Sequence, residues 1–138
     1  MPVDRWLAVG ALLLFIAAMP LPAIDGAGFP AFSGFDVLKQ GASAWRDGIV
    51  AWYANPVFLA ALIAGILRRH KLALGAATVG ILLALSSFTA GTMAESTGRS
   101  VPAFGFEIGF YLWLFAFVAL MLASAVGIYK ESKSNRAR

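Results

Sequence analysis

Apolar residues are concentrated in four stretches of this chain, and polar or charged segments separate them. A helix needs about 20 mostly apolar residues to cross the hydrocarbon core of a bilayer, and each stretch has about that length. The apolar residues are continuous instead of alternating with a period of two, which favours helices over a β-barrel. The pattern predicts an all-α membrane protein, a four-helix transmembrane bundle in one domain over residues 1–138, with spans at about 6–24, 50–67, 72–93 and 104–129.

The segment between the first two spans, residues 25–49, is too polar to cross a bilayer and carries a helical stripe. Its apolar positions alternate between spacings of three and four, as on one face of a helix. This predicts an amphipathic helix that lies in the membrane interface and leads into the second span. Because tryptophan and tyrosine rings prefer headgroup depth, the expected anchors are Trp45, Trp52 and Tyr53. The stripe consists of Phe35, Leu38, Ala42, Trp45, Ile49 and Trp52.

Two interpretations of the Asn55-Pro56 pair stay open. Proline in the first turn of a helix loses no hydrogen bond, so Pro56 can mark the start of the second span. Asn55 is then a candidate N-cap. If the span begins near Val50 instead, Pro56 kinks the helix and Asn55 becomes a buried polar group.

Composition excludes several classes of protein. Of the 138 residues, 60% are apolar and 13% are charged. So short a chain has too little interior to hide this many apolar residues from water, which excludes a soluble globular domain. The same composition excludes a disordered chain. The lack of cysteine excludes disulfide scaffolds, thiolate metal sites and CxxC redox chemistry.

Basic residues are unevenly distributed between the two sides that four spans define. Eight of the 11 lysines and arginines lie at the termini or in the loop between spans two and three. Because cytoplasmic loops carry the excess of lysine and arginine, both termini are expected in the cytoplasm, including the tail 130–138. Arg68, Arg69 and Lys71 are expected to contact anionic lipid headgroups. The net charge of +4 therefore requires no nucleic-acid partner.

Glu107 is the one ionisable residue that could lie inside the bilayer. It could be a structural group at headgroup depth, paired with Arg99 or with the start of its own helix. It could also form a proton or cation site, or contact a partner. The hydroxyls of the third span could bond to helix backbones or line a pore. The candidate ion or partner site therefore consists of Glu107, Arg99, Asn55, Ser86, Ser87 and Thr89.

The remaining chemistry-bearing motifs are weak. His70 is the single histidine, and the cations around it would repel a divalent metal ion. A Ser-His-Asp arrangement would need acids from the opposite side of the membrane. The sequence contains no Gly-rich phosphate loop. We therefore expect no catalytic residue, metal or cofactor.

Small residues recur at every fourth position in the last two spans. Gly105 with Gly109 is one such pair, and other members are Ala76, Gly80, Ala84, Ala119, Ala123 and Gly127. Such stripes let helix backbones approach closely, within one chain or between chains.

Three short aromatic segments carry a resemblance: FDVL at 35–38, AWYANP at 51–56 and GFYLWL at 109–114. In these segments and in layout, the chain resembles small four-span bacterial inner-membrane proteins of no assigned function. The resemblance implies a location in the bacterial inner membrane and adds no activity. Small multidrug transporters carry a glutamate in their first span, thiol-oxidising enzymes need cysteines, and fluoride channels have little charge bias, so these families fit poorly.

Contact surfaces are plentiful in this sequence and catalytic groups are missing. The expected function is that of a non-catalytic integral membrane accessory, assembly or immunity-type protein that acts through partner binding. The alternative is a small oligomeric channel or transporter that uses Glu107, Ser86, Ser87 and Thr89. An intramembrane enzyme comes third and would require Glu107, Arg99 and Glu95 to converge. The expected partners are an anionic bilayer and a membrane protein or a second copy of the chain.

Overall fold

The computed structural model describes residues 2–26, 29–42, 50–89 and 104–137. Most of these residues are helical, and a small sheet is also present. In chain order the elements are α1 (Val3–Ala18), β1 (Pro22–Gly26), β2 (Phe29–Ser33), α2 (Gly34–Gln40), the 3-10 helix η2 (Ala51–Tyr53), α3 (Ala54–Ile66), α4 (His70–Leu85), the 3-10 helix η3 (Ser86–Thr89), β3 (Phe104–Phe106) and α6 (Ile108–Arg136).

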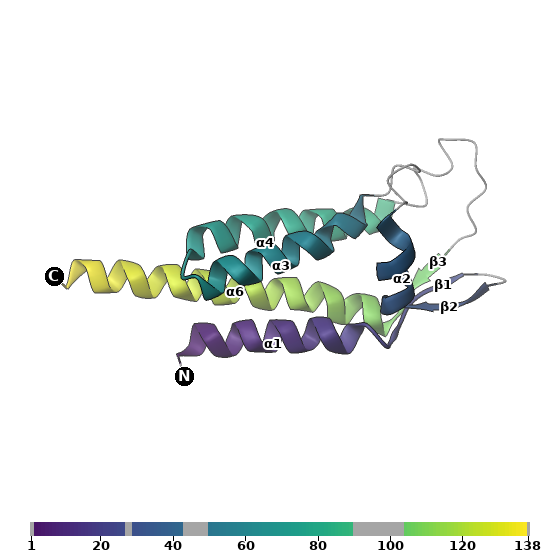
Figure 1. Cartoon of the computed structure of the whole chain (residues 1–138), viewed down its shortest axis with the longest axis horizontal. Helices are drawn as coiled ribbons and strands as arrows, with labels where there is room; N and C mark the ends of the chain where they lie inside the picture. Colours follow the sequence, from purple (N-terminus) through teal and green to yellow (C-terminus); the bar gives the residue numbers. More distant parts are fainter. Residues whose placement is uncertain (1, 27–28, 43–49, 90–103, 138) are drawn as a thin grey trace.

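The four long helices lie side by side along one axis (Figure 1). The most extensive packing joins α1 to α6, α3 to α4 and α4 to α6. Both chain ends and the turn between α3 and α4 lie at one end of the bundle, and α6 extends beyond its neighbours there. The sheet and α2 lie at the other end. We call these the terminal end and the sheet end.

Two of the described helices are long and apolar enough to cross a membrane. One is α4 continued by η3, His70–Thr89, and the other is α6. Only 22% and 33% of their most apolar segments are buried inside the protein. The core helix of a soluble protein would be mostly buried, so most of this apolar surface faces outward.

The expectation of an all-α protein is wrong at the sheet end. The first apolar stretch is helical only to Ala18, and residues 22–26 form β1 instead of a last helical turn. Proline cannot continue a helix without losing a hydrogen bond, and Pro20 and Pro22 follow α1 directly. The fourth stretch likewise starts as strand β3, and its helix begins at Ile108.

The three strands form an antiparallel sheet in the order β2-β1-β3. Ile24 of β1 lies opposite Phe32 of β2 and Phe106 of β3. The sheet therefore joins the end of α1 to the beginning of α6, two segments about 80 residues apart in sequence. This pairing fixes both helix ends around the space described below.

Of the predicted interfacial helix, the structure describes α2 and η2 as separate helical segments, and residues 43–49 lie outside the described residues. Ser33 caps the short helix α2, because its hydroxyl accepts from the Asp36 N–H at 3.2 Å and the Asp36 carboxylate accepts from the Ser33 N–H at 3.1 Å. Trp52 then turns back onto α2, and its indole N–H donates to the Leu38 carbonyl at 2.8 Å. A Cβ at Gly41 would lie 2.5 Å from the Trp52 ring, so glycine provides the room for this contact.

Aromatic rings hold the centre of the bundle together. Phe15 of α1 stacks on Phe58 of α3 with ring centroids 4.5 Å apart, and Phe58 meets Phe117 of α6 edge to face at 5.1 Å. Gly80 of α4 faces the Phe117 ring. The small residues predicted to allow close packing are only partly buried as a set: Gly80, Ala84, Gly109, Ala123 and Gly127 are buried, Ala76 and Ala119 are partly buried, and Gly105 is exposed. Alanines outside those stripes are fully buried as well: Ala11, Ala54, Ala61, Ala73, Ala77 and Ala116.

Candidate functional site

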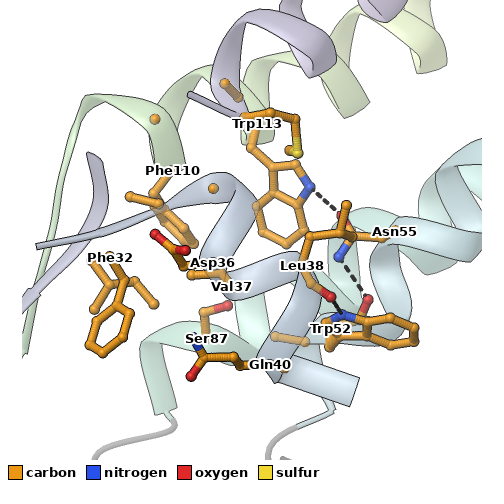
Figure 2. A pocket seen from close by; sticks show the side chains of 18 of the residues that line it. Phe32, Asp36, Val37, Leu38, Gln40, Trp52, Asn55, Ser87, Phe110 and Trp113 are labelled. Carbon is orange, nitrogen blue, oxygen red and sulfur yellow. Dashed lines mark hydrogen bonds between the residues drawn. The ribbon is translucent and has the colours of Figure 1, made fainter. Parts of the chain in front are cut away.

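A cavity of about 310 Å³ lies at the sheet end, between the helix ends, the sheet and α2. Figure 2 shows Phe32, Val37, Phe110 and Trp113 around it. Its polar lining residues are Asp36, Gln40, Asn55 and Ser87. Its walls come from α1, β1, β2, α2, η2, α3, η3, β3 and α6. The cavity therefore exists only because the sheet and α2 fold over the ends of the long helices. We call it the sheet-end cavity.

Asn55 is the buried polar residue beside this cavity, with 7% of its surface exposed. Its amide oxygen accepts from the Trp113 indole N–H at 2.9 Å, and its Nδ2 donates to the Trp52 carbonyl at 3.0 Å (Figure 2). Pro56 has no N–H to offer to the Trp52 carbonyl, which lies four residues earlier, so the Asn55 side chain supplies the missing donor. Asn55 is therefore a satisfied buried group inside α3 and not its N-cap.

Replacing Asn55 with leucine is expected to lower the free energy of unfolding by about 1–2 kcal/mol, because it leaves the Trp113 N–H and the Trp52 carbonyl without these partners. Titration of SDS into mild detergent micelles measures this change. The Trp113→Phe variant removes the same interhelical hydrogen bond from its other side. The double variant is expected to cost less than the sum of the two single variants. Strictly additive losses would contradict the coupling.

Asp36 lines the cavity, but its carboxylate is committed to capping α2. The Ser33 hydroxyl donates to Asp36 Oδ2 at 2.6 Å, and the Ser33 N–H donates to the same oxygen. These hydrogen bonds hold the pKa of Asp36 below its usual value, so the carboxylate stays ionised at neutral pH. An ionised carboxylate held in this way is a weak base.

The structure brings only part of the predicted site together. Asn55 and Ser87 line the sheet-end cavity, whereas Glu107, Ser86 and Thr89 do not. The Ser86 hydroxyl donates to the Leu83 carbonyl at 2.6 Å, and the Thr89 hydroxyl donates to the Ser86 carbonyl at 2.8 Å. Both bonds are local to their own helix, as the structural interpretation predicts.

Glu107 precedes the first residue of α6 and is half-buried. Its backbone N–H donates to the Ala23 carbonyl at 3.0 Å, which continues the pairing of β1 with β3. Arg99, its expected partner, lies outside the described residues. The use of Glu107 as an ion site stays a prediction.

The expected interfacial and headgroup residues lie at opposite ends. Trp52 lines the sheet-end cavity and Tyr53 is 39% exposed beside it, while Trp45 lies outside the described residues. Arg68, Arg69 and Lys71 are exposed at the terminal end, in and after the α3–α4 turn. Sequence reasoning missed the role of Trp113. An indole N–H within a span needs an acceptor, and Asn55 is a matching signal that could have suggested the pair.

The lining contains no histidine, lysine or arginine among the described residues. Over the same residues, no group of three or more histidine, cysteine, aspartate or glutamate side chains could hold a metal ion. The cavity thus has apolar walls, the hydrogen-bonded indoles of Trp52 and Trp113, and the Asp36 carboxylate, which takes part in capping α2. This arrangement can hold an apolar group.

No family model, no curated protein and no solved structure matches the chain.

Proposed function

We propose that the chain is an integral membrane protein of four spans, formed by α1, α3, α4 and α6. Large apolar side chains face outward on every one of these helices, among them Leu13, Ile63, Leu82 and Phe115, each more than half exposed. In water, exposed apolar surfaces of this kind would promote aggregation, whereas lipid tails solvate them. The 16 residues of α1 extend about 24 Å. Flanking residues in the interface accommodate that short length.

The distribution of charge supports an orientation for these four spans. The excess of lysine and arginine belongs to the terminal end, which the positive-inside rule assigns to the cytoplasm. The sheet-end cavity then opens toward the outer face of the membrane. A bacterial inner membrane is the location that the resemblance of the aromatic segments suggests.

Cysteine labelling tests the four spans and their orientation, and the chain has no cysteine of its own to interfere. A membrane-impermeant maleimide is expected to label Ser33→Cys in intact cells. It is expected to label Arg69→Cys and Ser134→Cys only after the membrane is opened. Labelling of Arg69→Cys and Ser134→Cys from opposite sides would overturn the four-span arrangement.

We further propose that the protein acts without catalysis, as an accessory, assembly or immunity-type component that binds a membrane protein at its sheet end. The observation that carries this proposal is the apolar cavity together with the exposed apolar side chains around it. Its size is at the low end of the roughly 300–1,000 Å³ of ligand pockets. It therefore suits one or two inserted side chains better than a whole cofactor.

Exposed aromatic rings at the sheet end extend the same apolar surface outward. Phe32 is 37% exposed, Phe35 50% and Phe88 50%. Buried cores of protein interfaces are enriched in such rings, and a side chain inserted into a pocket is a common hot spot. A hydrophobic or aromatic segment of a partner protein is the occupant that this surface favours.

Filling the cavity tests the binding proposal. Val37→Trp places a large side chain in the lining of the cavity. Lys39→Trp makes the same change at an exposed position of the same helix, which is outside the lining. Each tagged variant is purified from membranes after crosslinking from a photoreactive residue at Phe32. We expect Val37→Trp to reduce the crosslinked partner at least tenfold and Lys39→Trp to leave it unchanged.

Equal recovery from the two variants would contradict the proposed site. A photoreactive residue at Leu13, on the lipid-facing side of α1, gives the background of nonspecific neighbours. An adduct of twice the chain mass would identify the partner as a second copy of this protein. A measurable ion flux in liposomes without any reproducible adduct would favour the channel alternative.

A further inference from the structure

A second cavity, of about 650 Å³, lies at the terminal end between α1, α3 and α6. It exists because α1 packs on α6 and α3 packs on α4, while α1 and α3 make few contacts with each other. In Figure 1, α6 runs between α1 on one side and α3 with α4 on the other. We call this space the terminal groove.

The terminal groove is amphipathic along its length. Its inner part is lined by Leu12 of α1, Leu62 of α3 and Leu120 of α6. Its outer part is lined by five charged side chains and one histidine, all near the helix ends: Asp4, Arg5, Arg68, Lys130, Glu131 and His70. An apolar trough that ends in charges matches the build of a lipid with a charged headgroup.

The two acids of the groove already have basic partners. Asp4 accepts a hydrogen bond from Lys130, and this ion pair keeps Lys130 engaged. Glu131 Oε1 lies 3.8 Å from His70 Nε2. These contacts join the start of α1 and the start of α4 to the last turns of α6.

Arg5 and Arg68 are the two guanidinium groups of the groove, and among the described residues neither has an acidic partner. They come from different sides of the groove, α1 and the α3–α4 turn. Guanidinium groups bind phosphate oxygens through two parallel hydrogen bonds, and they retain their charge at any physiological pH. Within the described part of the chain, the groove thus carries two guanidinium groups that no carboxylate pairs with.

Arg68 occupies a backbone position at which glycine is the preferred residue. The Arg68 N–H donates to the Gly65 carbonyl at 3.0 Å and the Arg69 N–H to the Ala64 carbonyl at 2.8 Å. This pattern is a Schellman motif, in which glycine is the preferred residue at the position of Arg68. Arg68 has φ of 58°, in the left-handed region that side chains disfavour. The left-handed backbone at Arg68 therefore has a conformational cost that glycine would avoid.

We propose that the terminal groove binds an anionic glycerophospholipid, with its phosphate between Arg5 and Arg68 and one acyl chain along the apolar trough. Outward-facing Val9 and Ile66 border the groove, so it is continuous with the lipid-facing surface. In the proposed orientation it faces the cytoplasmic leaflet, where anionic lipids attract basic side chains. The inference rests on insertion in a membrane and is independent of partner binding at the sheet end.

Lipid binding to the purified full-length protein in mild detergent tests the proposal, with native mass spectrometry as the readout. Phosphatidylglycerol is expected to bind more tightly than phosphatidylcholine. Each arginine near a phosphate contributes about fivefold. We therefore expect Arg5→Gln and Arg68→Gln each to weaken phosphatidylglycerol binding about fivefold. The matched control Arg69→Gln removes a neighbouring charge that does not line the groove.

The variant Arg68→Gly separates a ligand contact from a structural role. It relieves the left-handed strain, so the lipid-free protein should be at least as stable as the wild type while phosphatidylglycerol binding falls. The acyl-chain contact is tested by Ala8→Phe, which narrows the groove, against Leu13→Phe on the outer face of the same helix. Only Ala8→Phe is expected to lower binding.

Three outcomes would overturn the proposal. Equal affinity for the two lipids would show that the headgroup charge is not recognised. An equal loss in Arg69→Gln would show a diffuse attraction without a site. Competition by inorganic phosphate, together with normal lipid binding by Ala8→Phe, would identify a site for free phosphate instead. A failure of partner binding at the sheet end would leave each of these results unchanged.

Discussion

Replacing Phe117 with alanine is expected to lower the free energy of unfolding by about 3 kcal/mol, the lower end of the range for buried aromatic truncations. The ring is fully buried and contacts Phe58 at 5.1 Å and Trp113 at 5.4 Å between centroids. It also fills the space left open by Gly80. In lipid the loss comes from packing contacts, because the surrounding hydrocarbon is as apolar as the core. SDS titration in mixed micelles measures the change.

Phe115→Ala is the matched control for this prediction. Phe115 lies on the same helix two residues earlier, and 60% of it is exposed. Its side chain contacts the surroundings more than the protein, so its removal is expected to change the unfolding free energy by less than about 0.5 kcal/mol. Equal losses in the two variants would contradict the assignment of Phe117 to the core. Equal losses in the two variants would also be the result if α6 were rotated about its axis relative to this structure.

Gly109→Ala is expected to destabilise the protein by about 1–3 kcal/mol, even though alanine is the better helix former. A Cβ at this position would lie 2.8 Å from the Pro22 carbonyl oxygen and 2.9 Å from the Leu21 carbonyl oxygen. Backbone atoms cannot turn aside as a flexible side chain can. The start of α6 would have to separate from the segment that follows α1, and thermal unfolding in detergent would show a lowered midpoint.

Two other glycines serve as controls for Gly109. A Cβ at Gly105, its partner at the fourth position before it, meets no atom within 4 Å, and the same is true of Gly75 inside α4. Gly105→Ala is expected to be neutral, and Gly75→Ala is expected to stabilise by about 0.5–1 kcal/mol through helix propensity. Because Gly109 also lines the sheet-end cavity, only its variant should also weaken partner crosslinking at the sheet end. Destabilisation by all three changes would point to a general intolerance of alanine and not to a close backbone approach.

Sequence periodicity predicted helices within all four apolar stretches, and the structure confirms helices there. It was wrong about the ends of the first and fourth stretches. A short apolar run that continues a helix and a short buried strand have the same pattern, so periodicity cannot separate them. Whether Pro22–Gly26 extends α1 or forms β1 depends on β3, which lies far along the chain. That all four helices cross a membrane stays a prediction.

The candidate site was only partly accessible to sequence reasoning. Sequence reasoning singled out Asn55 as an N-cap or a buried polar group, and it singled out Trp52 as an interfacial anchor. Their shared role appears only when Trp113 is brought against Asn55 from 58 residues away. Gly41 likewise makes room for the ring of Trp52, a residue that sequence spacing alone does not place against it. No pattern within a short stretch of sequence predicts the contact of Asn55 with Trp113 or that of Gly41 with Trp52.

By itself the sequence determined that the chain is rich in long apolar helices and that its basic residues gather at the termini and one turn. These properties are local, because they depend on composition and on spacing within about 20 residues. Only the tertiary structure decided where the sheet closes, which side chains surround the sheet-end cavity, and that α1 and α3 leave a groove between them. Those features depend on which distant surfaces meet, and that choice results from the fit of side chains such as Phe117 against Gly80 across the whole bundle.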